Sequence, residues 1–127
     1  MKPVMQTRFG RDGNCFAACV ASIFDLDLDQ VPDFAVKEGI WWEQLCEWSR
    51  SQGFVPLMVK APFGFGFSCI ASGISKRGLL HAVVWEKGKM IHDPHPDNTG
   101  IEGVNEFLVF VPTDYGRTLR ALEAMKV

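Results

Sequence analysis

The stretch Gly13–Ser22, with the sequence GNCFAACVAS, runs from a polar turn directly into an apolar segment. Its small and apolar residues continue for two more positions, which predicts a buried helix over residues 14–24 that is apolar on nearly all sides. Asp12 and Asn14 are the candidate caps, and Gly13 permits a left-handed turn just before the helix. The other elements are expected to pack around this helix.

Cys15 lies in the first turn of the predicted helix. Unpaired backbone N–H groups and the helix dipole at that end favour a thiolate over a thiol. Cys15 is therefore a candidate nucleophile. The alternative is an inert buried thiol, since free cysteine is among the most buried residue types, and burial in the core is the role expected for Cys19, Cys46 and Cys69.

The composition fits one domain over residues 1–127, with ten phenylalanines and four tryptophans that suggest a dense aromatic core. A net charge of −2 gives no electrostatic footprint for nucleic acid, so none is expected as a partner. No apolar run approaches the roughly 20 residues that span a bilayer, and the N-terminus lacks the layout of a signal peptide. We therefore expect a cytoplasmic protein with free thiols and no membrane partner.

Helical spacing returns at residues 41–51, where Trp41, Leu45 and Trp48 share one face and Gly53 follows as a terminator. After Gly53 the pattern changes to that of strands. Strands are predicted over residues 54–59, 67–74, 79–85, 89–93 and 106–111, the first at an edge because of Pro56. Residues 25–33 and 94–100 are expected to be loops, and residues 117–126 a terminal helix. Helices followed by antiparallel strands indicate an α+β domain with segregated layers.

His81 and Asp93 lie on the two strands of a predicted hairpin that turns at Glu86–Gly88. Pairing across the ladder brings His81 and a position close to Asp93 to the same end. A cysteine nucleophile needs such a base, and the base needs an acceptor that holds its tautomer. The alternatives are a histidine at a sheet edge with a structural partner, and an aspartate that begins a turn before Pro94.

Three short motifs occur in the order Gly13-Asn14-Cys15, His81-Ala82-Val83-Val84 and His92-Asp93-Pro94. A cysteine that opens a buried helix, a histidine that begins a later strand and an Asp-Pro that ends the next strand resemble the papain-like cysteine peptidase superfamily. Within it, the chain is most similar to small bacterial C39-like domains of the bacteriocin-leader peptidase kind. The resemblance implies a papain-like fold and a peptidase or amidase.

In that superfamily the cysteine is the nucleophile, the histidine the general base and acid, and an Asp or Asn orients the histidine. Carried over, these roles fall on Cys15, His81 and Asp93. The resemblance also implies that Gln6, the only glutamine upstream, forms the oxyanion hole together with the Cys15 N–H. Phe16 stands where many relatives carry a small residue.

Residues beside the nucleophile and in two loops are the expected contacts for a peptide or amide substrate. These residues are Asn14, Phe16, Phe65 and His95. Phe65 belongs to a tract of alternating glycine and phenylalanine that suits a loop with exposed rings, and His95 follows the proposed catalytic aspartate.

The implied chemistry is acyl transfer through a thioester, which requires no cofactor. An acyltransferase with the same triad and a non-catalytic peptide-binding module of the same fold are the alternatives. Cys15 and Cys19, four residues apart, with three histidines downstream, also suit zinc. Their spacing matches no zinc ribbon or finger, and no metal is expected.

Overall fold

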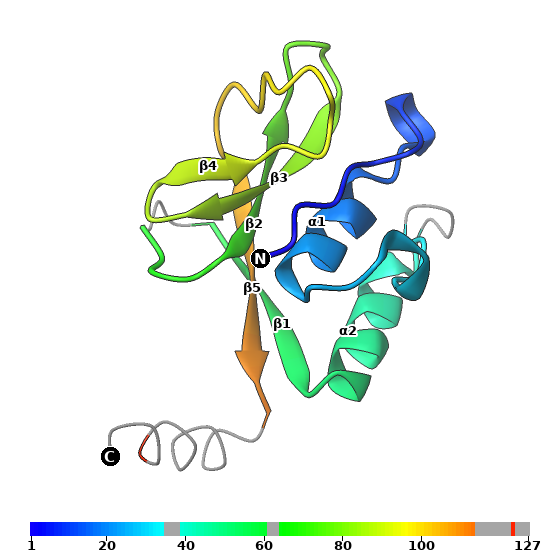
Figure 1. The fold of residues 1–127 in the computed structure, drawn as a ribbon, viewed down its shortest axis with the longest axis vertical. Helices are drawn as coiled ribbons and strands as arrows, with labels where there is room; N and C mark the ends of the chain where they lie inside the picture. Colours follow the sequence, from blue (N-terminus) through cyan, green and yellow to red (C-terminus); the bar gives the residue numbers. More distant parts are fainter. Residues whose placement is uncertain (35–38, 61–63, 114–122, 124–127) are drawn as a thin grey trace.

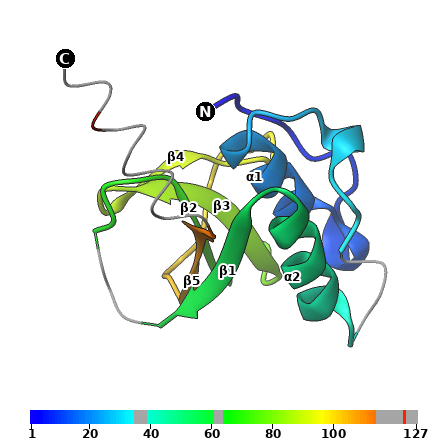
Figure 2. The same ribbon diagram turned by 90° about the horizontal axis from the view of Figure 1, so that it is seen from below.

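The structure, a computed structural model, describes residues 1–34, 39–60, 64–113 and 123. Within them, helices α1 (Cys15–Ile23) and α2 (Trp41–Ser51) precede a five-stranded sheet. Its strands are β1 (Phe54–Val59), β2 (Cys69–Ile74), β3 (Leu80–Glu86), β4 (Lys89–His92) and β5 (Glu106–Pro112). The strands pair antiparallel in the order β1-β5-β2-β3-β4, and both helices lie on one side of the sheet (Figures 1 and 2). The expected α+β architecture is confirmed.

The predicted element bounds agree closely with the observed ones. Helix α2 and strand β1 match the prediction residue for residue, and β1 is an edge strand as Pro56 indicated. A short 3₁₀ turn at Leu28–Gln30 lies within the predicted loop over residues 25–33, and another at Gly10–Asp12 precedes α1. The predicted terminal helix over residues 117–126 falls, apart from residue 123, outside the described residues.

Alternate side chains of the strands point to opposite faces of the sheet. On the face covered by α1 and α2, here called the helix-covered face, Ile70, Ala82, Val84 and Leu108 pack against both helices. On the other, here called the loop-covered face, the buried side chains are Cys69, Ala71, Val83, Phe107 and Val109. Side chains of the segments before β2 and before β5 pack over them, among them Phe65, Ile101 and Val104.

The buried residues of helix α1 are mainly small, which allows the helix to approach β3 closely. Cys19 in this helix and Cys69 in β2 are fully buried, as predicted, whereas Cys46 in α2 is half-buried. All four cysteines are free thiols. In the described part of the chain, no helix has both the length and the hydropathy needed to cross a bilayer.

The N-terminal segment connects α1 to the end of β4. The Val4 N–H donates to the Ser22 hydroxyl of α1 (2.9 Å), and the Val4 carbonyl lies 2.7 Å from Nε2 of His92. The Gln6 N–H donates to the Pro94 carbonyl at 3.0 Å. These contacts join the last turn of α1, the end of β4 and the residue after Asp93 to one N-terminal segment.

The segment before β5 lies directly on strand β2. The Glu102 N–H donates to the Ile74 carbonyl (2.8 Å) and the Asn105 N–H to the Ser72 carbonyl (2.7 Å). Between these contacts, a Cβ atom at Gly73 would lie 1.9 Å from the Gly103 carbonyl oxygen. Only a glycine at position 73 permits this close approach.

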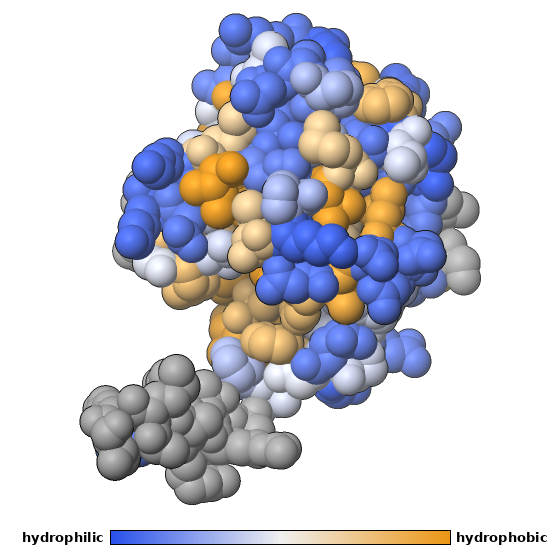
Figure 3. Space-filling model, viewed as in Figure 1, coloured by the Kyte–Doolittle hydropathy of each residue, from blue (hydrophilic) through white to orange (hydrophobic). Residues whose placement is uncertain are grey.

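The surface is mixed in character. In the space-filling view, apolar atoms form several separate patches among hydrophilic ones (Figure 3). Leu80, at the start of β3, has the largest exposed fraction among the large apolar side chains of the described residues, 68%. It lies at the rim of the candidate site described next.

Candidate functional site

The start of α1 is built differently from the prediction. Asn14 occupies the cap position but makes no side-chain capping bond, because its Oδ1 accepts the N–H groups of Thr7 and Arg8, both at 2.9 Å. Gly13 has a φ of −71°, so the expected left-handed turn is wrong. A glycine is needed there for space, since a Cβ would lie 3.0 Å from two backbone oxygens. The first turn of α1 thus keeps its N–H groups free of a side-chain cap.

The expected preference of Cys15 for the thiolate is also wrong. Burial is the largest influence and raises the pKa of the Cys15 thiol, and the charge of Asp93 raises it further. Hydrogen bonds from the backbone N–H groups of Ala82, Phe16 and Cys15 itself act in the opposite direction without overcoming burial. Cys15 is therefore a protonated thiol at neutral pH in the free protein, and its sulfur lies next to the residue that follows His81.

His81 and Asp93 form a buried hydrogen-bonded pair. Nε2 of His81 lies 2.7 Å from Oδ1 of Asp93, and the two residues are only 4% and 3% exposed. The Asp93 carboxylate also accepts the backbone N–H groups of His95 (2.9 Å) and Gly100 (2.8 Å). The carboxylate therefore fixes the His81 ring and the loop after β4 at the same time.

An irregularity in the hairpin determines which way Asp93 faces. Trp85 pairs with Met90 but Val84 pairs with His92, so Ile91 is one extra residue in β4. Continuing this register places Asp93 opposite Val83, two residues from His81 and hence on the same side of the hairpin. Without the extra residue Asp93 would face the opposite side.

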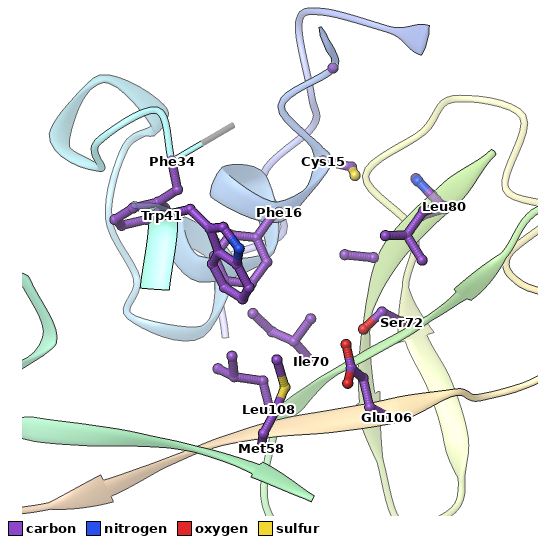
Figure 4. Close-up of a pocket in the computed structure, with 13 residues that line it drawn as sticks. Cys15, Phe16, Phe34, Trp41, Met58, Ile70, Ser72, Leu80, Glu106 and Leu108 are labelled. Carbon is purple, nitrogen blue, oxygen red and sulfur yellow. The ribbon is translucent and has the colours of Figure 1, made fainter. Parts of the chain in front are cut away.

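Cys15 and His81 line one cavity of about 240 Å³ between the N-terminus of α1 and the helix-covered face. Figure 4 shows the Cys15 sulfur at its upper edge, with the rings of Phe16, Phe34 and Trp41 along one wall. Among the described residues, no hydrogen bond joins the Cys15 thiol to the His81 ring. Hydrogen bonds between catalytic groups often tighten only when substrate is bound.

Two of the predicted substrate contacts lie at or beside this cavity. Phe16 lines it, with its ring centroid 5.7 Å from that of Phe34 and 5.9 Å from that of Trp41. The His95 ring lies outside the lining, 6.1 Å from the His81 ring.

The other predicted contacts lie elsewhere. Asn14 holds the N-terminal segment and borders a separate hollow. The ring of Phe65 packs 5.6 Å from that of Phe107 on the loop-covered face.

Gln6, the predicted oxyanion donor, is 7% exposed and does not line the cavity. Its Nε2 donates to the Arg8 carbonyl at 2.9 Å, while its Oε1 is buried without a hydrogen-bond partner among the described residues. The second N–H of the Gln6 side-chain amide does not take part in the hydrogen bond to Arg8.

Several cavity residues were not predicted from the sequence. Phe34 and Trp41 form part of the aromatic wall, and Ser72 and Glu106 add polar atoms on the sheet side. Trp41 was assigned to the apolar face of a helix, which does not distinguish a cavity wall from a filled core. The signal for Glu106 was a single carboxylate at the start of an otherwise apolar strand.

The described residues contain no group of three His, Cys, Asp or Glu side chains that could hold a metal ion. Cys19, one of the candidate zinc ligands, is fully buried in the core around α1. No protein-family model, curated protein or solved structure matches this chain. Function is therefore inferred from the geometry of the site.

Proposed function

We propose that this protein is a cysteine-dependent hydrolase, a peptidase or amidase, that uses Cys15, His81 and Asp93 on a papain-like fold of the C39-like kind. The observation that supports it most is the buried His81–Asp93 hydrogen bond next to a cavity that Cys15 also lines. A neutral imidazole that donates through Nε2 to a carboxylate carries its lone pair on Nδ1, which makes it a base.

The raised pKa of Cys15 indicates when the proton moves. The thiol is protonated at rest, so His81 accepts its proton as the sulfur attacks the substrate carbonyl. The negative charge of Asp93 stabilises the imidazolium that forms. In this sequence of events Cys15 acts with a general base rather than as a preformed thiolate.

Attack gives a tetrahedral oxyanion, for which the Cys15 N–H and the Gln6 amide are the proposed donors. One donor of this kind contributes about 2.7–4 kcal/mol to transition-state stabilisation. His81 then protonates the leaving amine, leaving a thioester on Cys15. Water attacks the thioester with His81 again as base, releasing the carboxylic acid and the free thiol.

Turnover of a fluorogenic peptide-amide library by the wild type and by Cys15→Ala tests this proposal. We expect Cys15→Ala to lose at least about 10³-fold in rate, because it removes the nucleophile. Cys46→Ala, which changes a half-buried thiol in α2, is the matched control and should keep full activity. The melting temperatures of both variants report whether the fold is intact.

Undiminished turnover by a folded Cys15→Ala variant would refute the triad. Binding of library peptides without any cleavage by the wild type would favour the non-catalytic peptide-binding module. Transfer of the acyl group to an added amine in place of water would identify an acyltransferase. A cytoplasmic location stays a prediction.

A further inference from the structure

Among the described residues that line the cavity, Glu106 carries the one charged side chain apart from the titratable His81 and Cys15. It is the first residue of β5 and pairs with Ser72 of β2. Figure 4 shows its carboxylate rising from the strand into the cavity beside the Ser72 hydroxyl. The charge thus lies on the floor of the space that holds the proposed nucleophile.

The surroundings of this carboxylate are mostly apolar. Ile70, Leu108 and Met58 form the neighbouring floor, and Phe16 and Trp41 face them from the helices. Glu106 is half-buried, and the described residues offer its carboxylate neither an ion pair nor a hydrogen bond. A half-buried carboxylate without a cation gains most from a positively charged ligand, because partial burial weakens screening by water.

The strand register gives the separation between this charge and the nucleophile. Ala82, whose N–H bonds the Cys15 sulfur, pairs with Ser72, and Ser72 pairs with Glu106. Two strand spacings amount to about 10 Å between the Ala82 and Glu106 backbones. A Lys or Arg side chain has an aliphatic stem that packs on apolar walls and a charged end that reaches such a carboxylate.

We propose that Glu106 selects substrates with a Lys or Arg side chain on the residue whose carbonyl is attacked. The aromatic wall contacts the aliphatic stem, and the carboxylate pairs with the ammonium or guanidinium group. The inference rests on the proposed function for the identity of the reacting bond, whereas the preference of the cavity for cations is independent of catalysis.

Charged thiol reagents test the cavity without requiring turnover. In a Cys46→Ala background, Cys15 is modified with positively charged aminoethyl and negatively charged sulfonatoethyl methanethiosulfonate, and the site is mapped by mass spectrometry. We expect the cationic reagent to react at least roughly tenfold faster. Glu106→Gln should reduce that ratio several-fold. Glu102→Gln, which removes an exposed carboxylate outside the cavity, should leave the ratio unchanged.

Peptide amides with Lys, Arg, Gln or Leu at the attacked residue then test the selection. We expect Glu106→Gln to lower the ratio of kcat/KM for the Lys and Arg substrates to kcat/KM for the Leu substrate about tenfold or more. Hydrolysis without a Lys or Arg preference, or a reagent ratio that is insensitive to Glu106→Gln, overturns this inference and leaves the hydrolase intact. A ratio that falls in Glu106→Gln, with no amide hydrolysed by the wild type, supports the cation site and refutes the hydrolase.

Discussion

The two faces of the sheet are both rich in aromatic rings, yet they are packed in different ways. On the loop-covered face Phe65 and Trp85 pack on Phe107, which is 4% exposed. On the helix-covered face Phe16 and Trp41 border a cavity of about 240 Å³ instead of filling it. Aromatic content alone therefore does not locate a binding site. The difference lies in the residues that border each space. Cys15 and His81 line the cavity under α1, whereas the described residues that line the hollow of about 510 Å³ on the loop-covered face, among them Trp85 and Phe107, include no cysteine or histidine.

Asp93→Ala is expected to have the largest effect, because Asp93 is a buried carboxylate that accepts three hydrogen bonds. The substitution removes the acceptor for His81 and for the backbone N–H groups of His95 and Gly100. Loss of one partner of a buried pair lowers the free energy of unfolding by about 3–5 kcal/mol. Urea unfolding measures this loss.

Asp93→Asn keeps an acceptor oxygen for His81 and should lose clearly less stability than Asp93→Ala. Equal stabilities of Asp93→Ala and the wild type would contradict the structural role assigned to this carboxylate.

Phe107→Ala tests whether the loop-covered face serves packing alone. Truncation of this buried ring should lower the free energy of unfolding by about 3 kcal/mol through lost burial and a residual cavity. The alkylation rate of Cys15, measured where the variant is still folded, should stay within about twofold of the wild type, an expectation that follows from the distance between the faces. A large change in that rate would show that the two faces are coupled.

The smallest predicted effect concerns the helix-covered face and the pH dependence of Cys15 alkylation by iodoacetamide. The folded-state pKa of Cys15 is raised above its ordinary value of 9.0, so the thiolate fraction at pH 7 is small. His81 compensates as a base, and His81→Gln, which keeps a donor toward Asp93, should react about tenfold more slowly at pH 7.

The rates of the wild type and His81→Gln should converge as the pH rises past the raised pKa, because the thiol then ionises without help. Equal alkylation rates of Cys15 in both proteins at every pH would show that His81 does not act as the base for Cys15. A rate difference that persists unchanged at high pH would indicate instead that the substitution changes the access of iodoacetamide to Cys15.

Local patterns in the sequence were sufficient to predict the helices, the hairpin and the edge position of β1. Pro56 excluded a central strand, and the turn at Glu86–Gly88 placed His81 near Asp93. The insertion of β5 between β1 and β2 was not predicted, because pairing between strands far apart in the sequence depends on the whole fold.

The sequence pointed to the three residues of the proposed triad, whereas most of the residues that line the cavity around them were not predicted. The extra residue Ile91 leaves no local signature, although it sets the side toward which Asp93 points. The pKa of Cys15 was misjudged because helix-end effects can be inferred from sequence, whereas burial depends on what packs nearby. Phe16 and Phe65 were both expected to contact substrate, but Phe16 belongs to α1 and Phe65 to the segment before β2, and these two parts of the chain cover opposite faces of the sheet.

Gly73 limits which sequences this fold can accept. Its register partner is His81, and the segment that lies over it continues back to Gly100, whose N–H is bonded to Asp93. Even a single methyl group at position 73 would push Gly103 outward, and with it the chain that anchors the aspartate. Substitution of the buried Gly73 is therefore restricted by the candidate site, although Gly73 does not itself line the cavity.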